Sequence, residues 1–551
     1  MDPARFQRID AAPRVLFDQI ENYRTRPRFM VRRGNTWDAV TWDAFGDQTR
    51  AIACFLDAFG LEAGQRSAIF APNSVKWAAS ALAIQSVGAT MVPIYPGNTA
   101  EQALYVLDHS DTSVLFVDSE HLLARVLSVW SQLDALRWVV LLDDTLDPHR
   151  LSADLPNPLS HSDIAARCIR WSDAARIGEL IHEQNPTRFT SRLQAIDLDA
   201  PGLMLYTSGT TGNPKGVPLT HNNVGINARD WLNLQAETIP ENSVDLLWLP
   251  MSHIFGFGEM CLGNQLGFTS YLCEPSEALD SLPRIRPDVF MSVPGYWEKI
   301  AQRARDLATG SVESALSQVT GGRLRFCLSG GAGLKREIKE FFYEHGVIII
   351  EGYGLTECSP TLTLNRAGDF DFSTVGKVLP SVEVKLADDG EILARGPTVF
   401  SGYHKNPEAS AEAFDPDGWF KTGDVGVWTD NGFLRIIDRK KDILVTSGGK
   451  NIPPSNIEVR FADDPWVEHV VVYGDGKKYL VAGIWPVADR LEDPELEAQL
   501  ARSVEQVNAE LPRVETIKKF CVLREPLSVD NGLLTASLKV RRKRVYDAFR
   551  S

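Results

Sequence analysis

Short apolar runs alternate with helical stretches between Val40 and about Asp118. The runs are Arg66–Ala71, Thr90–Ile94 and Ser113–Val117, and each has the length of one buried strand. Alternation of this kind is typical of α/β layering, in which helices cover a sheet. The sequence therefore predicts an α/β fold here. Residues 145–195 are polar, and we expect a surface excursion or an inserted helix pair there.

Three later apolar runs each end in a loop rich in glycine or hydroxyl groups. They are LMLYTSGTTGNPKG at 203–216, LRFCLSGGAG at 324–333 and VIIIEGYGLTE at 347–357. Open α/β sheets bind ligands at loops that follow buried strands. One such loop is common, because many turns between strand and helix contain glycine. Three of them in this stretch favour a single shared pocket.

The pattern changes near Asp438. Apolar runs at 467–473, 479–485 and 515–523 surround a stretch with a 3.6-residue apolar period. That stretch carries Leu496, Leu500, Val504, Val507 and Leu511. We therefore expect a large domain at 1–438 and a small α+β domain at 439–551, joined by a polar hinge.

Charge and cysteine usage exclude several classes of protein. The net charge is −15 over 551 residues, which disfavours a protein that binds nucleic acid. Residues 439–551 carry 19 Lys and Arg against 17 Asp and Glu, so the negative charge lies in the body of the chain. The seven cysteines are scattered, without zinc spacing.

Neither a leader nor a membrane span is predicted. The chain starts without a basic and then apolar leader, and it has no run of about 18 apolar residues, the length that crosses a bilayer. We expect a reduced, cytoplasmic protein with at most peripheral membrane contact. The sequence does not indicate an oligomeric state.

The segment Tyr206–Gly216 is suited to polyphosphate. Its glycines let backbone N–H groups approach an oxyanion, its hydroxyls add donors, and Lys215 adds a full charge. It is not a Walker A loop, because Lys215 follows proline and precedes glycine. The chain has no GxGxxG after a strand and no GxSxG, which disfavours dehydrogenases and α/β-hydrolases. Taken alone, the loop could also be a flexible surface turn.

YTSGTTGNPKG resembles the phosphate-binding signature of the adenylate-forming superfamily, which includes acyl-CoA synthetases, luciferases and nonribosomal-peptide adenylation domains. Three further motifs follow in that family's order, namely Tyr353-Gly-Leu-Thr-Glu357, Trp419-Phe-Lys-Thr-Gly-Asp424 and Asp438-Arg-Lys-Lys-Asp442. The resemblance covers the chain from about Val40 to Arg544. It implies a large N-terminal domain of layered α/β subdomains with a small β-barrel-like part, and a small mobile C-terminal α+β domain.

The resemblance also implies residues that bind ATP. Its phosphate-binding residues are Thr207, Ser208, Gly209, Thr210, Thr211, Gly212 and Lys215. Gly330, Gly331 and Ala332 would form the backbone wall of its adenine slot, Tyr353 would stack on the adenine, and Gly354 belongs to the same nucleotide-binding set. Thr356 would contact the α-phosphate, Glu357 would bind Mg²⁺, and Asp424 with Arg439 would bind the ribose. Taken singly, a tyrosine after glycine is usually a packing residue, and an aspartate after glycine usually marks a turn.

The catalytic lysine implied by the resemblance is Lys539. Many family members have Gly-Lys there, whereas this chain reads Thr535-Ala-Ser-Leu-Lys539, similar to the long-chain fatty acyl-CoA synthetase branch. A neighbouring basic residue is the alternative. If they have no catalytic role, Arg541–Arg544 would form a solvated helix face or a weak contact with anionic lipid. The resemblance places the hinge at Lys441, for which a static loop is the alternative.

Leu249–Phe257 resembles the segment that lines the acyl pocket and the thiol channel, with His253 at its centre. A buried histidine with satisfied hydrogen bonds is the alternative. Phe257 takes the place where some long-chain relatives carry a gating tryptophan. Arg286–Ile300 is again similar to the fatty acyl branch of the family. An apolar tunnel beside this segment would suit the alkyl chain of a fatty acid.

The resemblance implies an ATP-dependent fatty acid:CoA ligase for medium to long chains. It would act through an acyl-adenylate, with Mg²⁺, ATP and coenzyme A, and release AMP and pyrophosphate. Alternatives are transfer of the acyl group to an acyl carrier protein, β-lactone formation from a hydroxy acid, and a non-catalytic nucleotide-binding module.

Overall fold

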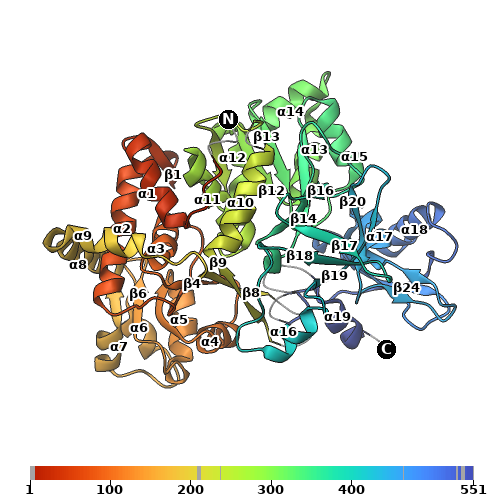
Figure 1. The fold of residues 1–551 in the computed structure, drawn as a ribbon. Coiled ribbons are helices and arrows are strands. Elements are labelled where there is room, and N and C mark those ends of the chain that lie inside the picture. The colour runs from red at the N-terminus through yellow and green to blue at the C-terminus, as the bar shows by residue number, and fades with distance from the viewer. Residues whose placement is uncertain are drawn as a thin grey trace. The chain divides into compact units, whose positions relative to one another are not determined.

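The computed structural model describes residues 6–207, 213–235, 237–462, 464–528, 531–534 and 540–549. They divide into two compact units (Figure 1). We call Met1–Thr207, Pro214–Val384 and Ala394–Phe420 the large unit. The small unit contains Lys385–Leu393 and Lys421–Ser551. A domain boundary at 438/439 stays a prediction.

The first sheet of the large unit has seven strands in the order β7-β6-β5-β3-β4-β8-β9. The strands are β3 (Arg66–Phe70), β4 (Thr90–Ile94), β5 (Thr112–Val117), β6 (Trp138–Leu141), β7 (Cys168–Arg170), β8 (Pro201–Thr207) and β9 (Lys215–Thr220). They run parallel except β9, which is antiparallel to β8. All residues of β4 and β5 are buried, so the apolar runs predicted as strands are confirmed.

The second sheet has nine strands in the order β16-β15-β14-β13-β12-β10-β11-β1-β2. The strands are β1 (Pro27–Arg33), β2 (Thr36–Thr41), β10 (Val244–Leu247), β11 (Thr269–Leu272), β12 (Val289–Ser292), β13 (Phe326–Ser329), β14 (Ile349–Gly354), β15 (Thr361–Leu364) and β16 (Lys377–Val378). Because β13 and β14 are parallel neighbours, the loops after them leave the sheet at the same edge.

Helices cover both sheets. They are α1 (Ala12–Tyr23), α2 (Trp42–Ala58), α3 (Val75–Ser86), α4 (Ala100–His109), α5 (Glu120–Ser128), α10 (His221–Gln235), α11 (Ile254–Leu266), α12 (Ala278–Ile285), α13 (Pro294–Leu307), α14 (Val312–Thr320), α15 (Arg336–Glu344) and α16 (Pro407–Ala413). Thr41, Ser74 and Thr99 cap α2, α3 and α4, each accepting a backbone N–H bond. Helix α3 is buried along its whole length between α1, α2 and the sheet.

The polar segment 145–195 is largely helical. It contains α6 (Pro148–Ala153), α7 (His161–Arg167), the edge strand β7, α8 (Trp171–Gln184) and α9 (Pro186–Gln194). Helix α8 packs along α2, and Trp171 and Ala174 are buried there. The segment is therefore more than an inserted helix pair.

The small unit combines three sheets. Its first sheet has the order β17-β18-β19-β20, its second pairs β21 with β22, and its third has the order β23-β24-β25. The elements are β17 (Glu383–Leu386), β18 (Glu391–Arg395), β19 (Phe420–Trp428), β20 (Leu434–Arg439), β21 (Leu444–Val445), β22 (Asn451–Ile452), α17 (Pro454–Glu458), β23 (Val467–Tyr473), β24 (Leu480–Pro486), α18 (Leu496–Ala509), β25 (Ile517–Val522) and α19 (Arg542–Phe549). Leu496, Leu500, Val504 and Val507 of α18 are buried as predicted, while Leu511 lies past the helix end. The predicted mixed α/β fold with a smaller C-terminal part is confirmed.

Candidate active site

The hairpin of β8 and β9 carries both ends of the predicted phosphate-binding loop. Thr207, the last residue of β8, lies opposite Lys215, the first residue of β9. Ser208, Gly209, Thr210, Thr211 and Gly212 lie outside the described residues. The Nζ atom of Lys215 lies 4.6 Å from the centroid of the Tyr403 ring.

The predicted magnesium ligand reaches the same tyrosine. Glu357 belongs to the short turn Thr356–Cys358 after β14, and this turn packs against β9. The Tyr403 hydroxyl donates to Glu357 Oε1 at 3.1 Å, and Glu357 is buried. The structure thus brings Lys215 and Glu357 to one place in the large unit, with Thr356 half-buried beside them.

Tyr353 and Gly354 end strand β14. Tyr353 is half-buried and pairs with Thr363 of β15. A side chain at Gly354 would place its Cβ 1.8 Å from the Pro360 carbonyl oxygen, so only glycine fits. The backbone at this position is therefore held tightly against the neighbouring chain.

The predicted adenine wall is the loop after β13. The Gly330 N–H donates to the Ser292 carbonyl at 3.1 Å, and Gly331 has a left-handed backbone at φ +83°. Gly331 and Ala332 are exposed. Because this loop follows β13 and Tyr353 lies at the end of the parallel neighbour β14, they are found at one edge of the sheet.

A buried ion pair holds the end of this loop. Glu351 Oε1 accepts from the Leu334 N–H at 2.8 Å, and Glu351 Oε2 pairs with Lys339 Nζ of α15. The two charged side chains are 3% and 4% exposed. Burial raises the pKa of Glu351, although Lys339 opposes the shift.

Asp424 and Arg439 meet in the small unit. They lie opposite each other on β19 and β20, and Arg439 Nε lies 2.8 Å from Asp424 Oδ1. The Asp424 N–H donates to Thr422 Oγ1 at 3.1 Å, which holds the backbone of Asp424 in the strand. Asp424 is buried, while half of the Arg439 side chain is exposed. The two residues implied for the ribose are therefore in direct contact.

Lys441 lies in a turn directly after β20 and is exposed. The Asp442 and Ile443 N–H groups donate to the Arg439 carbonyl at 3.0 and 3.1 Å, which closes the turn. Lys440 instead pairs with Asp389 and Glu391 at 2.5 and 2.7 Å. The two neighbouring lysines therefore differ, because Lys440 is held by two carboxylates and Lys441 is exposed in the turn.

Lys539 lies outside the described residues. The sequence predicts a solvated helix face or a lipid contact for the basic run Arg541–Arg544. This prediction is wrong for Arg542. Arg542 is 15% exposed and forms a two-pronged ion pair with Glu458, at 2.5 and 2.6 Å. Lys543 and Arg544 are exposed. The carboxylate of Glu458 explains the difference, because its charge and its two oxygens compensate a guanidinium that is largely withdrawn from water.

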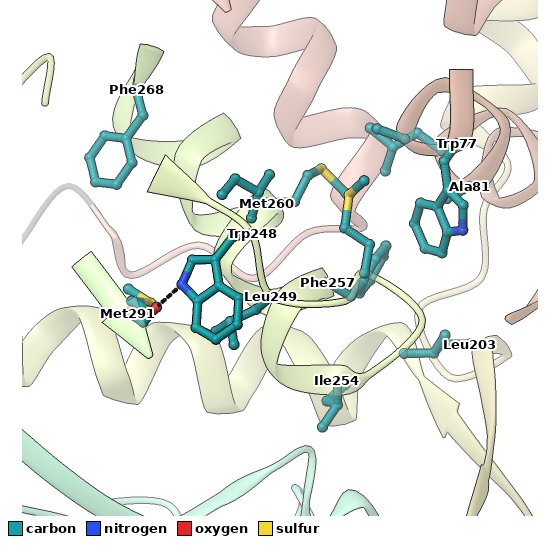
Figure 2. Close-up of a cluster of buried hydrophobic side chains, with 14 of the residues drawn as sticks. Trp77, Ala81, Leu203, Trp248, Leu249, Ile254, Phe257, Met260, Phe268 and Met291 are labelled. Carbon is teal, nitrogen blue, oxygen red and sulfur yellow. Dashed lines mark hydrogen bonds between the residues drawn. The ribbon is translucent and has the colours of Figure 1, made fainter. Parts of the chain in front are cut away.

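His253 is not a buried histidine. It is exposed and caps α11, where its Nδ1 atom accepts from the Phe255 N–H at 3.2 Å. Phe257, one turn later, is 2% exposed and its ring packs edge-on against Trp77. Figure 2 shows it among apolar side chains from separate segments, including Trp248, whose Nε1 donates to the Met291 carbonyl.

A cavity of about 60 Å³ lies beside Phe257 in the large unit. Cys261 and Gln265, on the same face of α11 as Phe257, line it together with Val224 and Ala228 of α10. The space is several times the roughly 10–15 Å³ that one water molecule needs. It is too small for a whole long alkyl chain.

The described parts of the chain contain no group of three or more His, Cys, Asp or Glu side chains placed to hold a metal ion. Glu357 alone still fits Mg²⁺, because that ion keeps most of its waters and takes only one or two carboxylates beside substrate phosphates. In the same ranges, no helix is long and apolar enough to cross a membrane.

Two family models match the chain. Residues 16–404 match the model described as AMP-binding enzyme, and residues 441–551 match the AMP-binding enzyme C-terminal domain. The chain belongs to the AMP-binding enzyme family. The resemblance seen in its motifs is confirmed, and ATP-dependent activation of an acid is the chemistry that the comparisons support.

Several characterised proteins are similar along nearly the whole chain. The long-chain-fatty-acid–CoA ligase FadD15 of Mycobacterium bovis is 32% identical, with 96% of this chain and 95% of the relative covered. The peroxisomal long chain acyl-CoA synthetase 6 of Arabidopsis thaliana is 28% identical, with 93% and 80% covered. The A-PCP didomain of carboxylic acid reductase from Segniliparus rugosus, solved with AMP, has a TM-score of 0.81 at 22% identity, with 100% and 82% covered.

Sequence reasoning missed Tyr403, Lys339 and Glu351. Lys339 carried one signal, since it lies beside Ile338 and one turn before Phe342 on the apolar side of its helix. Tyr403 lies between the recognised motifs, and no feature of its neighbours points to Lys215 or Glu357.

Proposed function

We propose that this protein is an ATP-dependent fatty acid:CoA ligase for medium to long chains. The observation that carries the proposal is the convergence of Lys215 and Glu357 on Tyr403 beside the glycine-rich hairpin, in a chain of the AMP-binding enzyme family. A fixed ammonium and a buried carboxylate at one place suit a metal-bound polyphosphate.

In the first step a carboxylate oxygen of the fatty acid attacks the α-phosphorus of ATP, and pyrophosphate leaves. Both reactants are anions, so the site must neutralise charge at the phosphorus. Thr356 and Lys539 would donate to the α-phosphate, while Lys215 and the hydroxyls of Thr207, Ser208, Thr210 and Thr211 would hold the pyrophosphate. Mg²⁺ at Glu357 would supply further positive charge.

The nucleoside would be held by the remaining residues. Tyr353 offers an aromatic face to adenine against the backbone of Gly330, Gly331 and Ala332. The carboxylate of Asp424 would accept from the ribose hydroxyls, held in place by Arg439.

In the second step the thiolate of coenzyme A attacks the acyl carbon, and AMP leaves. We assign this step to a second arrangement in which residues 439–551 turn about Lys441 and carry Lys539 away. The exposed turn that holds Lys441 suits a hinge, because a hinge residue must change its backbone angles freely.

The substrate class rests on the long-chain ligases to which the chain is similar. The cavity beside Phe257, lined by both apolar and polar side chains, is the space that we assign to the end of the acyl chain. His253, at the exposed start of the same helix, would face the thiol channel. Location in the cytoplasm and magnesium dependence belong to the same proposal.

The test is AMP formation by the purified full-length protein. Acids from acetate to eicosanoate, aryl acids and hydroxy acids are assayed with coenzyme A, with an acyl carrier protein, and without acceptor. We expect AMP and a thioester with long-chain acids and coenzyme A, and loss of AMP formation in Lys539→Ala. Transfer only to the carrier protein, lactone formation, or ATP binding without turnover would overturn the proposal.

A further inference from the structure

Tyr403 contacts two charged residues of opposite sign through two different parts of its side chain. Its ring lies under the Lys215 ammonium at 4.6 Å, and its hydroxyl donates to Glu357 Oε1 at 3.1 Å. All three residues belong to the large unit, and Lys215 and Tyr403 are both half-buried.

The two contacts act differently on the donors of Lys215 and on the charge of Glu357, which are the groups that a ligand would meet. An aromatic face attracts an ammonium through its quadrupole and accepts no conventional hydrogen bond, so the three N–H donors of Lys215 are not used by the ring. The phenol is a neutral donor, so it orients the Glu357 carboxylate without cancelling its charge. A direct Lys215–Glu357 ion pair would neutralise both groups instead.

The segment around Tyr403 is itself fixed to the hairpin. The Tyr403 N–H donates to Ser410 Oγ at 2.8 Å, and its ring packs edge-on against Phe400 at 4.8 Å. The next residue, His404, donates its N–H to the Gly216 carbonyl at 2.9 Å. Lys405 pairs with Asp111 at 2.8 Å. Tyr403 therefore has anchors that do not depend on either of its charged partners.

We infer that Tyr403 is a positioning residue that sets the separation between the phosphate-binding Lys215 and the magnesium-binding Glu357. The inference rests on the proposed function. Its ring orients the lysine toward the phosphates, and its hydroxyl orients the carboxylate toward the metal. The two functions reside in separable parts of one side chain.

Two substitutions separate them. Tyr403→Phe keeps the ring and removes the hydroxyl, and Tyr403→Leu removes both. In the full-length protein, ATP binding is measured by calorimetry without Mg²⁺, and AMP formation is measured across a Mg²⁺ titration. For Tyr403→Phe we expect unchanged metal-free ATP affinity and an about tenfold higher Mg²⁺ requirement, the usual size of a lost bond to a charged group. For Tyr403→Leu we expect the metal-free affinity to fall as well, by about 3- to 10-fold.

Tyr343→Phe and Tyr343→Leu are the matched controls, since Tyr343 is exposed on α15 and its ring packs edge-on against Phe370 and Phe372. Thermal unfolding identifies any variant that does not fold, and Tyr403→Phe carries the test if Tyr403→Leu is lost. If Tyr403→Phe loses metal-free ATP affinity as much as it loses AMP formation with Mg²⁺, Tyr403 has a general packing role and the inference is wrong. Unchanged values in both variants would do the same. Absence of AMP formation by the wild type contradicts the proposed function instead, while the metal-free binding data still test the ring contact.

Discussion

Lys339 and Glu351 form an ion pair that is almost completely withdrawn from solvent and is bonded to the end of the loop that carries the predicted adenine wall. Glu351 and Tyr353 are two residues apart on β14, so their side chains leave the same face of the strand. The second carboxylate oxygen of Glu351 holds the Leu334 N–H. One charged group thus links the strand that carries Tyr353 to the loop of Gly330 and Gly331.

Breaking this pair on one side should destabilise the large unit. In Lys339→Met the carboxylate of Glu351 stays buried without its cation, which costs about 3–5 kcal/mol. Lys339→Met/Glu351→Gln should recover most of this loss, because a neutral amide oxygen still accepts from the Leu334 N–H. Urea unfolding of both variants measures the difference. A Lys339→Met variant as stable as the wild type at neutral pH would show that the pair adds nothing.

The same variants should differ in their response to pH. Burial raises the pKa of Glu351 above its ordinary 4.5, and Lys339 limits this rise. Without Lys339 the folded-state pKa rises further, and the folded state then binds the proton more tightly than the unfolded state. Stability of Lys339→Met should therefore fall as pH increases from the unfolded-state pKa to the folded-state pKa. The slope should vanish in Lys339→Met/Glu351→Gln, and its persistence there would assign it to another group.

Asp424→Asn should weaken nucleotide binding with little effect on folding. The Arg439 side chain is half exposed, so water can solvate its charge once the carboxylate is gone, and we expect a stability change of about 0–1 kcal/mol. An amide presents one acceptor where the carboxylate presents two, so one ribose hydroxyl loses its partner. We expect the variant to lose preference for ATP over 2′,3′-dideoxy-ATP, measured as the ratio of kcat/KM values. Arg439→Lys is the comparison, because it retains the Asp424 acceptor. Preserved discrimination in Asp424→Asn would remove Asp424 from the ribose site.

Cys261→Leu should shorten the preferred acyl chain if the cavity beside Phe257 holds the end of that chain. The added side chain fills part of the roughly 60 Å³ space. Each methylene that the variant excludes from the site lowers the binding free energy of the acid by about 0.8 kcal/mol. KM should therefore rise for the longest acids and stay constant for shorter ones. Cys521→Leu, at an exposed cysteine of the small unit, is the control. A uniform change across all chain lengths would place the acyl chain elsewhere.

The sequence predicted elements where the pattern is local. β4 and β5 are continuous apolar runs, and the periodic stretch from Leu496 became α18. The meeting of Lys215 with Glu357 follows from packing of β9 against the turn after β14, which no local pattern records. Arg542 shows the same limit, since its buried state depends on Glu458, 84 residues earlier in the chain. Such tertiary partners decide whether a charged residue is solvated or buried.

Lys441→Pro should separate the two steps of the proposed reaction. Proline fixes φ near −65°, so a turn residue that must rotate between two arrangements no longer can. ATP–pyrophosphate exchange with fatty acid requires only the first arrangement and should stay largely intact, whereas thioester formation should be lost. Lys441→Ala removes the same charge and leaves the backbone free, so it should retain both activities. Lys440 is unsuitable for the comparison, since its N–H donates to the Gly423 carbonyl at 2.8 Å and its side chain pairs with Glu391. Equal loss of both steps in Lys441→Pro, with Lys441→Ala active, would mean that the turn shapes the adenylation arrangement itself and that the hinge lies elsewhere.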